Sequence, residues 1–494
     1  MEKYDDKVIL ENKELNIWEA MIPMIFLIIL LFFNVFYVFG DDALGGSNQF
    51  ILLLSGAVAA IVGFYNKVSY KKMIDKVADN FKSTTGAILI LLMVGALAGT
   101  WLLSGIIPTM IYYGLKILNP TIFLPATVII CAIISLATGS SWTTSATVGI
   151  ALIGIGDAMG ISMAMTAGAV ISGAYFGDKM SPLSDTTNLA SAMAGADLFD
   201  HIKYMTYTTV PSILITIVIF TVIGFTQETV GQTDTSSILN SIEGSFNINI
   251  ALFLVPGIVI YMIIKKTKPL IALLIGSLLG GVFAVIFQPG IVSSVSGIDG
   301  ELTGISAYKG VMNALTTDIA IVTENEQLND LFTAGGMKGM LGTIWLIMTA
   351  MVFGGVMEAI GALSRISKAL LSMAKSTFGL FASAVSSCLA LNLTASDQYL
   401  SIVVSGKMYK DAFKERDLAP ENLSRTLEDA GTVTSVLIPW NTCGAYQAGV
   451  LGVSVGEYFI YAIFNYISPF MTLLFAMAKI KIKRISSTSS IYKE

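Results

Sequence analysis

Apolar runs long enough to cross a lipid bilayer recur along this 494-residue chain, and they constrain its fold more than any other feature. A transmembrane helix needs about 20 predominantly apolar residues to cross about 30 Å of hydrocarbon. Such runs lie near residues 17–39, 49–64, 84–105, 120–138, 161–178, 205–225, 248–264, 270–287, 340–360, 377–393 and 456–479. No soluble domain of ordinary size fits between them, so the sequence predicts an all-α polytopic membrane protein.

The composition excludes several other classes of protein. Charged residues make up only 13% of the chain, about half the fraction in an ordinary soluble domain. No basic stripe interleaved with aromatic residues is present, which argues against nucleic-acid binding. The three cysteines, Cys131, Cys388 and Cys443, are too far apart to predict a disulfide framework or a C-x-x-C metal site. The single histidine, His201, is predicted to lie in a surface loop, and no resident cofactor is expected.

The distribution of basic residues predicts the topology of the chain. Lysine and arginine gather at residues 67–82, 265–268, 407–425 and 479–484, which the positive-inside rule places in the cytoplasm. The opposite loops are poor in basic residues and lie at 41–49, 227–246 and most of 288–331. This alternation needs about seven passes in each half, counting the weaker stretches 143–156, 397–406 and 430–450 as full or partial spans. The sequence thus predicts roughly 11–14 membrane segments.

An odd number of passes inverts the second half relative to the first, so we predict inverted-topology repeats with broken or re-entrant helices. The predicted parts are a cytoplasmic tail (1–16), a first repeat (17–226), an external loop (227–247), a second repeat (248–480) and a cytoplasmic tail (481–494). Internal identities support this plan. The shift that lays Gly361 on Gly105 also lays Ser396 on Ser140, and a slightly smaller shift aligns Gly449 with Gly195.

Four polar, glycine-containing breaks interrupt the apolar runs, at residues 138–144, 177–188, 392–398 and 428–444. Within hydrocarbon, unwound backbone is tolerated only where it is buried in protein or lines a cavity. Under the internal alignment, the first break pairs with the third and the second with the fourth. We therefore expect the breaks to converge on one site near the middle of the bilayer.

Side chains with oxygen at these breaks are the predicted ligands of a sodium ion or a proton. A carboxylate at membrane depth costs roughly 3 kcal/mol on insertion scales, which indicates function where one occurs. The predicted ion-binding and proton-binding residues are Asp185, Asp397, Glu428, Asp429, Thr187, Asn188, Ser140, Ser141, Thr144, Asn392, Ser396 and Asn441.

Purely structural roles remain open for several of these residues. Asp185 or Asp397 would also serve as a helix cap. Glu428 and Asp429 diverge by about 100° on a helix, so at least one is expected to be structural. Either of them would form a solvated salt bridge with Arg425, and Lys179 would neutralise its neighbour Asp178.

Several long motifs resemble one family. They are Ser181-Pro-Leu-Ser-Asp-Thr-Thr-Asn-Leu189, Ser396-Asp-Gln-Tyr399, and Leu427-Glu-Asp-Ala-Gly-Thr432 followed by Ile438-Pro-Trp-Asn-Thr442. In this order they closely resemble the NhaC family of bacterial sodium/proton antiporters, and the resemblance runs from about residue 18 to about residue 479. It implies a transporter and not an enzyme. Its substrates would be sodium ions and protons, and its place the bacterial inner membrane.

The resemblance also implies a mechanism. The family is similar to the ion-transporter superfamily, in which paired helical hairpins bind sodium between a scaffold and a mobile domain. We expect a buried carboxylate to bind either a proton or a sodium ion, with only the loaded forms crossing the membrane. Some relatives exchange protonated malate for sodium and lactate, so organic-acid exchange stays the alternative. A membrane hydrolase is disfavoured, because the chain lacks H-E-x-x-H and has one histidine. Assembly as a homodimer is left open.

Overall fold

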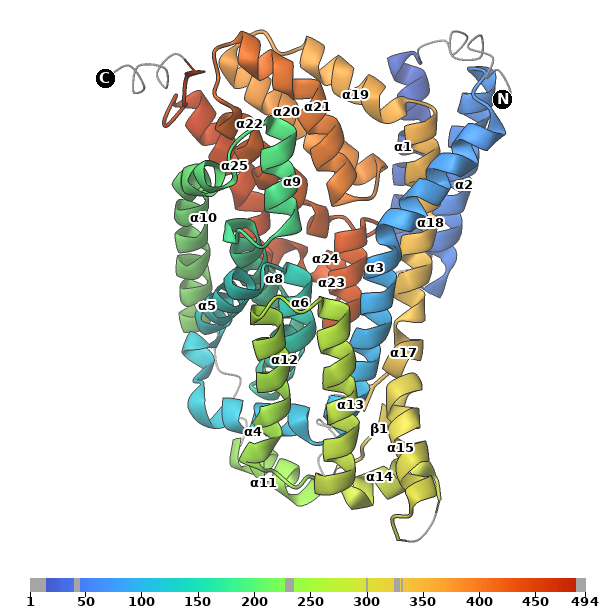
Figure 1. Ribbon diagram of the computed structural model, residues 1–494, viewed down its shortest axis with the longest axis vertical. Coiled ribbons are helices and arrows are strands. Elements are labelled where there is room, and N and C mark those ends of the chain that lie inside the picture. Colours follow the sequence, from blue (N-terminus) through green and yellow to red (C-terminus); the bar gives the residue numbers. More distant parts are fainter. Residues whose placement is uncertain are drawn as a thin grey trace.

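The computed structural model describes residues 15–39, 45–226, 235–298, 301–323, 329 and 332–485, and it is almost entirely helical (Figure 1). In this part of the chain the strands are β1 (Ile319–Ala320) and β2 (Thr333–Ala334), which pair antiparallel. The predicted tails lie largely outside the described residues, as does the first part of the predicted loop 227–247, residues 227–234. Helix α11 (Thr235–Ser245) nevertheless makes the end of that loop helical.

Eight helices among the described residues are long and apolar enough to cross a membrane, or ten if each of two bent pairs counts as one span. The eight spans are built from α1 (Ile17–Phe33) with the π-helical segment Asn34–Phe39, α2 (Ser47–Tyr65), α3 (Tyr70–Leu103), α5 (Pro120–Thr138), α10 (Leu198–Thr226), α13 (Pro269–Phe287), α17 (Gly336–Gly339) with α18 (Leu341–Ala359), and α20 (Thr377–Thr394). The bent pairs are α11 with Ile250–Phe253 and α12 (Leu254–Ile264), and α24 (Val455–Tyr458) and Phe459–Tyr461 with α25 (Ile463–Met477). The prediction of an all-α polytopic protein is confirmed.

Two helical hairpins take the place of four of the predicted passes. After α5 the chain turns and returns through α6 (Ser141–Thr144), the π-helical segment Ser145–Gly149 and α7 (Ile150–Ala158). Gly156 near the end of α7 faces the ring of Phe123 near the start of α5, which closes this hairpin. After α20 the chain returns through α21 (Gln398–Glu415), and Ser387 on α20 bonds to Tyr409 on α21 at 2.8 Å. The weaker stretches 143–156 and 397–406, predicted as full or partial spans, are therefore the return arms of these hairpins.

Each hairpin is followed by a broken helix. In the first repeat, α8 (Met163–Met180) and α9 (Asp185–Ala194) are separated by residues 181–184. In the second repeat, α22 (Pro420–Thr426) continues into the π-helical segment Leu427–Thr432 and is separated from α23 (Thr442–Leu451) by residues 433–441. A short 3₁₀ turn, Ser435–Leu437, lies inside this second break.

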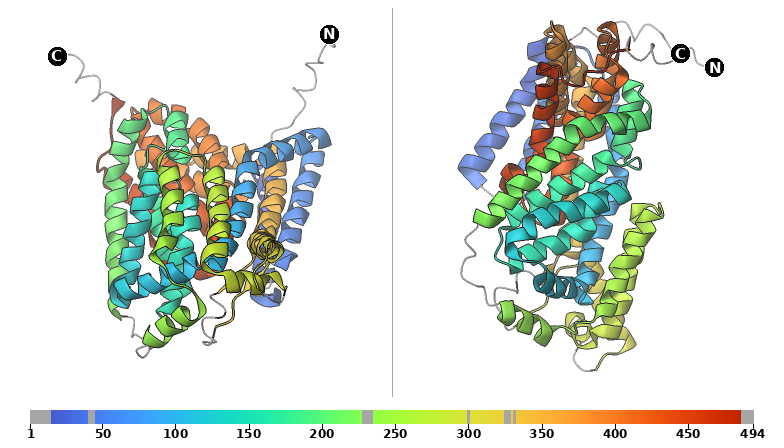
Figure 2. Two further views of the ribbon diagram at one scale, coloured as in Figure 1. Left: turned by 60° about the horizontal axis from the view of Figure 1, so that its bottom comes forward. Right: turned by 90° about the vertical axis from the view of Figure 1, so that its left-hand side faces the viewer.

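The order and direction of these elements confirm the inverted repeat. Helices α4 (Ile106–Ile117) and α19 (Ala362–Ser372) each begin after a left-handed glycine, Gly105 with φ 77° and Gly361 with φ 81°. In Figure 1, α5 starts from the end of the molecule where α4 lies, and α20 starts from the opposite end beside α19; Figure 2 agrees from two other sides. The hairpin α1–α2 packs on α18, and the hairpin α12–α13 packs on α3.

Helices α14 (Pro289–Ser296) and α15 (Gly304–Thr316) are an insertion in the second repeat, between α13 and α17.

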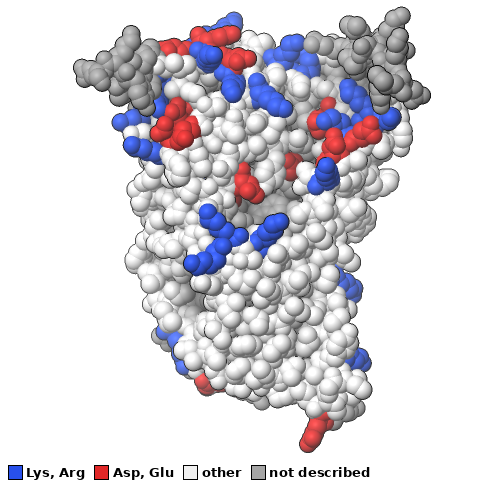
Figure 3. Space-filling view, in the orientation of Figure 1, with Lys and Arg blue, Asp and Glu red and all other residues white. Residues whose placement is uncertain are grey.

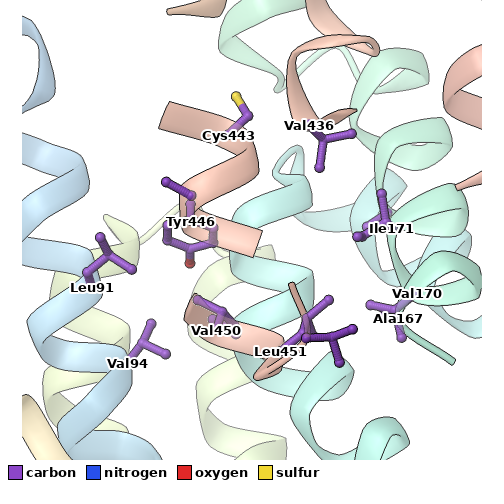
Figure 4. Close-up of a cluster of buried hydrophobic side chains, with 14 of the residues drawn as sticks. Leu91, Val94, Ala167, Val170, Ile171, Val436, Cys443, Tyr446, Val450 and Leu451 are labelled. Carbon is purple, nitrogen blue, oxygen red and sulfur yellow. The ribbon is translucent and has the colours of Figure 1, made fainter. Parts of the chain in front are cut away.

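Close packing fixes the broken helices against the spans. A Cβ on Gly173 or Gly177 of α8 would collide with a backbone carbonyl of α5, so these glycines allow the two helices to approach closely. Figure 4 shows α23 packed between α3 and α8, through Val450 and Leu451. The ring of Trp142 on α6 stacks on that of Tyr446 on α23, with centroids 4.0 Å apart. The two halves of the molecule thus share one core.

Candidate functional site

Residues from all four breaks line one cavity of about 480 Å³. The two hairpin tips and the two broken helices supply its polar wall, namely Thr138, Gly139, Ser140, Trp142, Thr143, Asp178, Leu183, Ser184, Asp185, Thr186, Asp397, Gln398, Tyr399 and Thr442. The turn between α12 and α13 adds Lys266 and Lys268. Figure 3 shows a hollow at mid-height of one face, with acidic and basic side chains around its rim. The lower half of that face carries few charges.

Asp178 belongs to this cavity, although the sequence did not place it in the site. Its carboxylate accepts hydrogen bonds from the backbone N–H of Ser141 at 3.0 Å and from the Ser141 hydroxyl at 2.7 Å. This contact joins the first hairpin tip to the first broken helix. The predicted neutralisation of Asp178 by Lys179 is wrong, because adjacent side chains on a helix diverge and Lys179 pairs elsewhere.

Asp397 is both a helix cap and a cavity residue. It is 4% exposed, and its carboxylate accepts from the backbone N–H of Leu400 at 3.0 Å as the N-cap of α21. The hydroxyl of Thr442, at the start of α23, lies 3.4 Å from its other oxygen. The second hairpin tip thus touches the second broken helix through an acid and a hydroxyl.

The alignment of Ser140 with Ser396 is wrong. Ser140 caps α6 by accepting from Thr143, as Asp397 caps α21, so Ser140 corresponds to Asp397. The left-handed residue before each cap is Gly139 in the first tip and Ser396, with φ 59°, in the second. The second repeat has one more residue than the first before its hairpin, because the N-caps Asn119 of α5 and Ser376 of α20 are already displaced as far as Gly139 and Ser396.

The alignment of Gly195 with Gly449 is also wrong. The left-handed glycine that ends α9 is Gly195, and the one that ends α23 is Gly452. The two caps are displaced by one residue more than Gly105 and Gly361, in agreement with the extra residue before α20.

The predicted ligands of the first broken helix divide into two groups. Asp185 is exposed and lines the cavity at the start of α9, where a helix N-terminus favours negative charge. Thr187 donates to the carbonyl of Lys179 at 3.0 Å, and Asn188 donates to the carbonyls of Pro182 and Ser184 at 3.0 and 2.7 Å. Thr187 and Asn188 therefore hold the break together and do not line the cavity.

The asparagine side chains of the second repeat also bond to the backbone of a break. Asn392 donates to the carbonyl of Gly431 at 2.7 Å and to the hydroxyl of Thr434 at 3.0 Å. Asn441 donates to the carbonyl of Asn392 at 3.1 Å and caps α23. Both amides fasten the second hairpin to the second broken helix. Neither lines the cavity.

Two of the predicted hydroxyl ligands are also buried away from the cavity. Thr144 donates to the carbonyl of Ser140 at 2.9 Å, one turn behind the first tip. Ser396 is fully buried, and its hydroxyl has no hydrogen-bond partner in the part of the chain that the structure describes. Ser140 lines the cavity, and Ser141 acts through its bonds to Asp178.

A second cluster of charged residues lies behind the cavity and is completely buried. Lys179 forms an ion pair with Asp429, which also accepts from the hydroxyls of Thr208 at 2.9 Å and of Thr472. The neighbouring acid Glu428 is fully buried too, and neither of its oxygens has a hydrogen-bond partner among the described residues. We call Lys179, Asp429 and Glu428 the buried cluster.

Arg425 does not form the predicted solvated salt bridge with Glu428 or Asp429. It is fully buried, and its guanidinium stacks on the ring of Tyr204 with 4.6 Å from Cζ to the centroid. His201 is not in a surface loop, because α10 begins three residues earlier. Its ring is buried and lies 2.7 Å from the hydroxyl of Ser424.

The chemistry of the cavity suits a hard cation. Asp178, Asp185 and Asp397 supply carboxylates, and hydroxyls lie between them; cations of this kind prefer oxygen ligands. No three acidic, histidine or cysteine side chains in the described part converge as a metal centre. A cation held here would therefore also bind hydroxyl and carbonyl oxygens.

Comparison with known proteins gives one consistent result. Residues 173–480 match the profile described as the Na⁺/H⁺ antiporter family. The chain is 37% identical to the Na⁺/H⁺ antiporter NhaC of Alkalihalophilus pseudofirmus, over 88% of this chain and 90% of the relative. It is 34% identical to the Na⁺/H⁺ antiporter NhaC of Bacillus subtilis, over 87% and 92%. It is 36% identical to the malate-2H⁺/Na⁺-lactate antiporter of Bacillus subtilis, over 93% and 92%.

Proposed function

Because the chain belongs to the Na⁺/H⁺ antiporter family, we propose that it exchanges sodium ions for protons across a bacterial cell membrane by alternating access. The observation that carries this proposal is the convergence of both hairpin tips and both broken helices on one oxygen-lined cavity. Broken helices at a repeat interface are a recurrent site for coupling ions in transporters.

In this proposal the sodium ion binds between Asp178 and Asp397. One acid comes from each repeat, and the hydroxyls of Ser140, Thr143 and Thr442 lie along the same wall. An empty site would carry uncompensated carboxylate charge through a low-dielectric region, which costs several kcal/mol. The carrier therefore crosses only when sodium or protons compensate this charge, and that restriction makes the transport an exchange.

We place the lysine-bearing mouth of the cavity in the cytoplasm. Lys266 and Lys268 belong to a basic turn, and the positive-inside rule assigns such turns to the cytoplasmic side. Helix α1 begins and α25 ends at one end of the molecule, which supports cytoplasmic placement of both termini (Figure 1). The conformation would then be the inward-facing one.

Organic-acid exchange is the second candidate function, because one relative of similar identity is named a malate-2H⁺/Na⁺-lactate antiporter. A substrate carboxylate needs a cationic or amide partner. Lys179 is paired with Asp429, and Arg425 stacks on Tyr204, so neither of these buried cations lines the cavity. The rim lysines, the amide of Gln398 and the helix N-termini at the breaks remain as partners for a carboxylate. The two relatives named Na⁺/H⁺ antiporters favour the plain cation exchange.

The deciding experiment uses proteoliposomes loaded with a pH-sensitive dye. An inward sodium gradient should drive proton efflux at the same rate with and without malate and lactate. Proton movement that requires malate on one side and lactate on the other would establish the second candidate in its place. Absence of sodium-driven proton movement under both conditions would refute both functions.

A further inference from the structure

We propose that the exchanged proton is bound by Glu428, outside the cavity that holds the sodium ion, and that Asp178 couples the two ions through charge. This inference rests on the proposed sodium/proton exchange. In the simpler mechanism, the sodium ion and the proton compete for one carboxylate. Here they bind to two neighbouring sites, the cavity and Glu428, which are never occupied at the same time.

Glu428 has the environment that a proton carrier needs. It is 0% exposed, and no hydrogen bond reaches either carboxylate oxygen within the described chain. The hydroxyls of Thr432 and Thr186 are its polar neighbours. A buried carboxylate without partners is costly to keep charged, whereas its protonated form is readily buried. Proton uptake is therefore the natural way to neutralise this side chain.

Asp429, the adjacent acid, has the opposite environment. Lys179 compensates its charge, and Thr208 and Thr472 donate to its second oxygen. A carboxylate with these three partners stays charged, because protonation would leave the lysine unpaired. The ion pair is therefore a fixed part of the buried cluster, and Glu428 is its exchangeable part.

The charges that act on Glu428 come from two adjacent residues of α8. Lys179 attracts its negative charge, and Asp178 repels it. These two side chains diverge from the end of α8, so that Asp178 lines the cavity while Lys179 lies in the buried cluster. Through Asp178, the charge felt by Glu428 depends on what the cavity contains.

The other segments packed around Glu428 carry no charge that the contents of the cavity can cancel, apart from Asp185. They are α9, α20, α21, α22 and α25. Helices α20 and α25 contain no acidic or basic residue, and those of α21 are at least partly exposed to solvent. Asp185 of α9 is exposed at the cavity, Arg425 stacks on Tyr204, and Glu421 pairs with Lys483. Asp178 is thus the nearby charge that a cavity cation can cancel.

A row of hydroxyls joins the two sites. Ser184 and Thr186 line the cavity, and their oxygens lie 3.1 Å apart. Thr186 is also a polar neighbour of Glu428, without a hydrogen bond to it in this conformation. In our proposal the Thr186 hydroxyl turns toward Glu428 and relays the proton to cavity water, donating one proton while it accepts another.

The coupling follows from Coulomb's law. While the cavity is empty, the negative charge of Asp178 opposes ionisation of Glu428 and keeps its proton bound. A sodium ion beside Asp178 cancels that charge, so Glu428 ionises next to Lys179 and releases its proton to the cavity. One cation enters as the other leaves, and the total charge of the two sites does not change.

The test compares two transport modes of Glu428→Gln in proteoliposomes. Sodium-driven proton movement should fall at least about tenfold, because the amide cannot titrate. Exchange of labelled sodium for unlabelled sodium at constant pH should stay within about twofold of wild type, since the cavity ligands are intact. Glu421→Gln, on the same helical segment but paired with Lys483, is the control and should retain both modes.

Two results would overturn the inference. Normal sodium/proton exchange in Glu428→Gln would show that the proton binds elsewhere. Loss of both modes in a protein that elutes as a folded species would place Glu428 in the sodium site itself. Failure of the proposed function looks different, because wild type would then lack sodium-driven proton movement.

Two further variants keep the test decisive if Glu428→Gln does not fold. Glu428→Asp retains an acid, but withdraws it by one methylene from Thr186, and should shift the pH profile of exchange. Thr186→Val removes the hydroxyl with little change of shape and should slow proton exchange while sparing sodium/sodium exchange. An unchanged pH profile in the first, together with unchanged proton exchange in the second, would refute the proposal.

Discussion

The two repeats make the same contact between hairpin tip and broken helix, but with the chemical roles exchanged. In the first repeat the tip supplies a hydroxyl, Ser141, and the broken helix supplies an acid, Asp178. In the second repeat the tip supplies the acid, Asp397, and the broken helix supplies the hydroxyl of Thr442. Inverted repeats thus reproduce backbone geometry without reproducing the chemistry of the site.

The two acids also differ in how firmly they are held. Asp178 accepts two hydrogen bonds from Ser141, whereas Asp397 accepts one at its cap and has a contact of 3.4 Å with Thr442. The 3.4 Å contact of Asp397 is the weakest of these and is the most easily exchanged for a cation. Asp397 is therefore the better direct ligand, and Asp178 the better fixed counter-charge.

Asp397→Asn should reduce sodium/proton exchange more than any other substitution. A smaller effect would contradict the assignment of Asp397 as the direct sodium ligand. The amide keeps the shape of the side chain and an acceptor for Leu400, but it removes the negative charge that holds sodium. Exchange in proteoliposomes should fall to background, at least about 100-fold, as expected when one partner of a buried charge contact is removed. Lys410→Gln, an exposed position on the same helix, should leave exchange nearly unchanged.

Asp178→Asn should weaken sodium transport less than Asp397→Asn. Its oxygen can still accept from Ser141, so the tip stays in place while the counter-charge is lost. We expect a rise of about tenfold in the sodium concentration for half-maximal exchange. Asp185→Asn should cost less than this, because its exposed charge is screened by water. An effect of Asp185→Asn as large as that of Asp397→Asn would make the mouth of the cavity the sodium site.

Ser141→Ala and Thr442→Val test the exchanged hydroxyls. Removing the 2.7 Å bond from Ser141 to Asp178 should cost about 1 kcal/mol, or about fivefold in sodium affinity. Removing the 3.4 Å contact from Thr442 to Asp397 should change affinity by less than about twofold. Sodium affinities measured from initial rates of exchange show which of the two substitutions is the more harmful. If Thr442→Val were the more harmful, Thr442 would be a sodium ligand in its own right.

Exchanging the left-handed residues of the tips should affect stability and should change transport least. A Cβ on Gly139 would lie 2.6 Å from Cβ of Leu183, so Gly139→Ser should lower the free energy of unfolding by about 2 kcal/mol. Ser396→Gly removes the strain of a serine in the left-handed conformation, but it also raises the conformational entropy of the unfolded chain. These two effects on the free energy of unfolding should cancel to within about 1 kcal/mol. Thermal unfolding in detergent measures both. Equal destabilisation would mean that the tips do not differ in packing.

The helices and the breaks are the parts of this fold that the sequence predicts well. The apolar run 120–138 coincides with α5. An uncharged segment of this length is stable in a bilayer only as a helix, because a helix satisfies all of its own backbone hydrogen bonds. The breaks were found for the same reason, since polar and glycine residues are costly in a lipid-exposed helix. The sequence does not separate a return arm from a full crossing, because the two have the same composition.

The roles of polar side chains within a break are harder to predict. Side chains on unwound backbone do not alternate between faces with a fixed period. Nothing in the sequence therefore distinguishes Asp185, which lines the cavity, from Asn188, which bonds to backbone carbonyls within the break. The pairing of Lys179 with Asp429 joins residues far apart in the chain, whereas the sequence suggested the neighbour Asp178. His201 was misplaced because a lone polar residue near a helix start gives no signal of its partner, Ser424.

The equivalent caps Ser140 and Asp397 also bear on how the two halves diverged. If they descend from one duplicated segment, a substitution at this position was enough to give one copy an acid, because serine and aspartate cap a helix about equally well. The extra residue of the second repeat lies outside the hairpin, before α20, whereas one inserted within α5 or α20 would rotate every later side chain of that helix by about 100°. Hairpin tips are thus the places where a duplicated transporter gene can acquire new ligands without losing its scaffold.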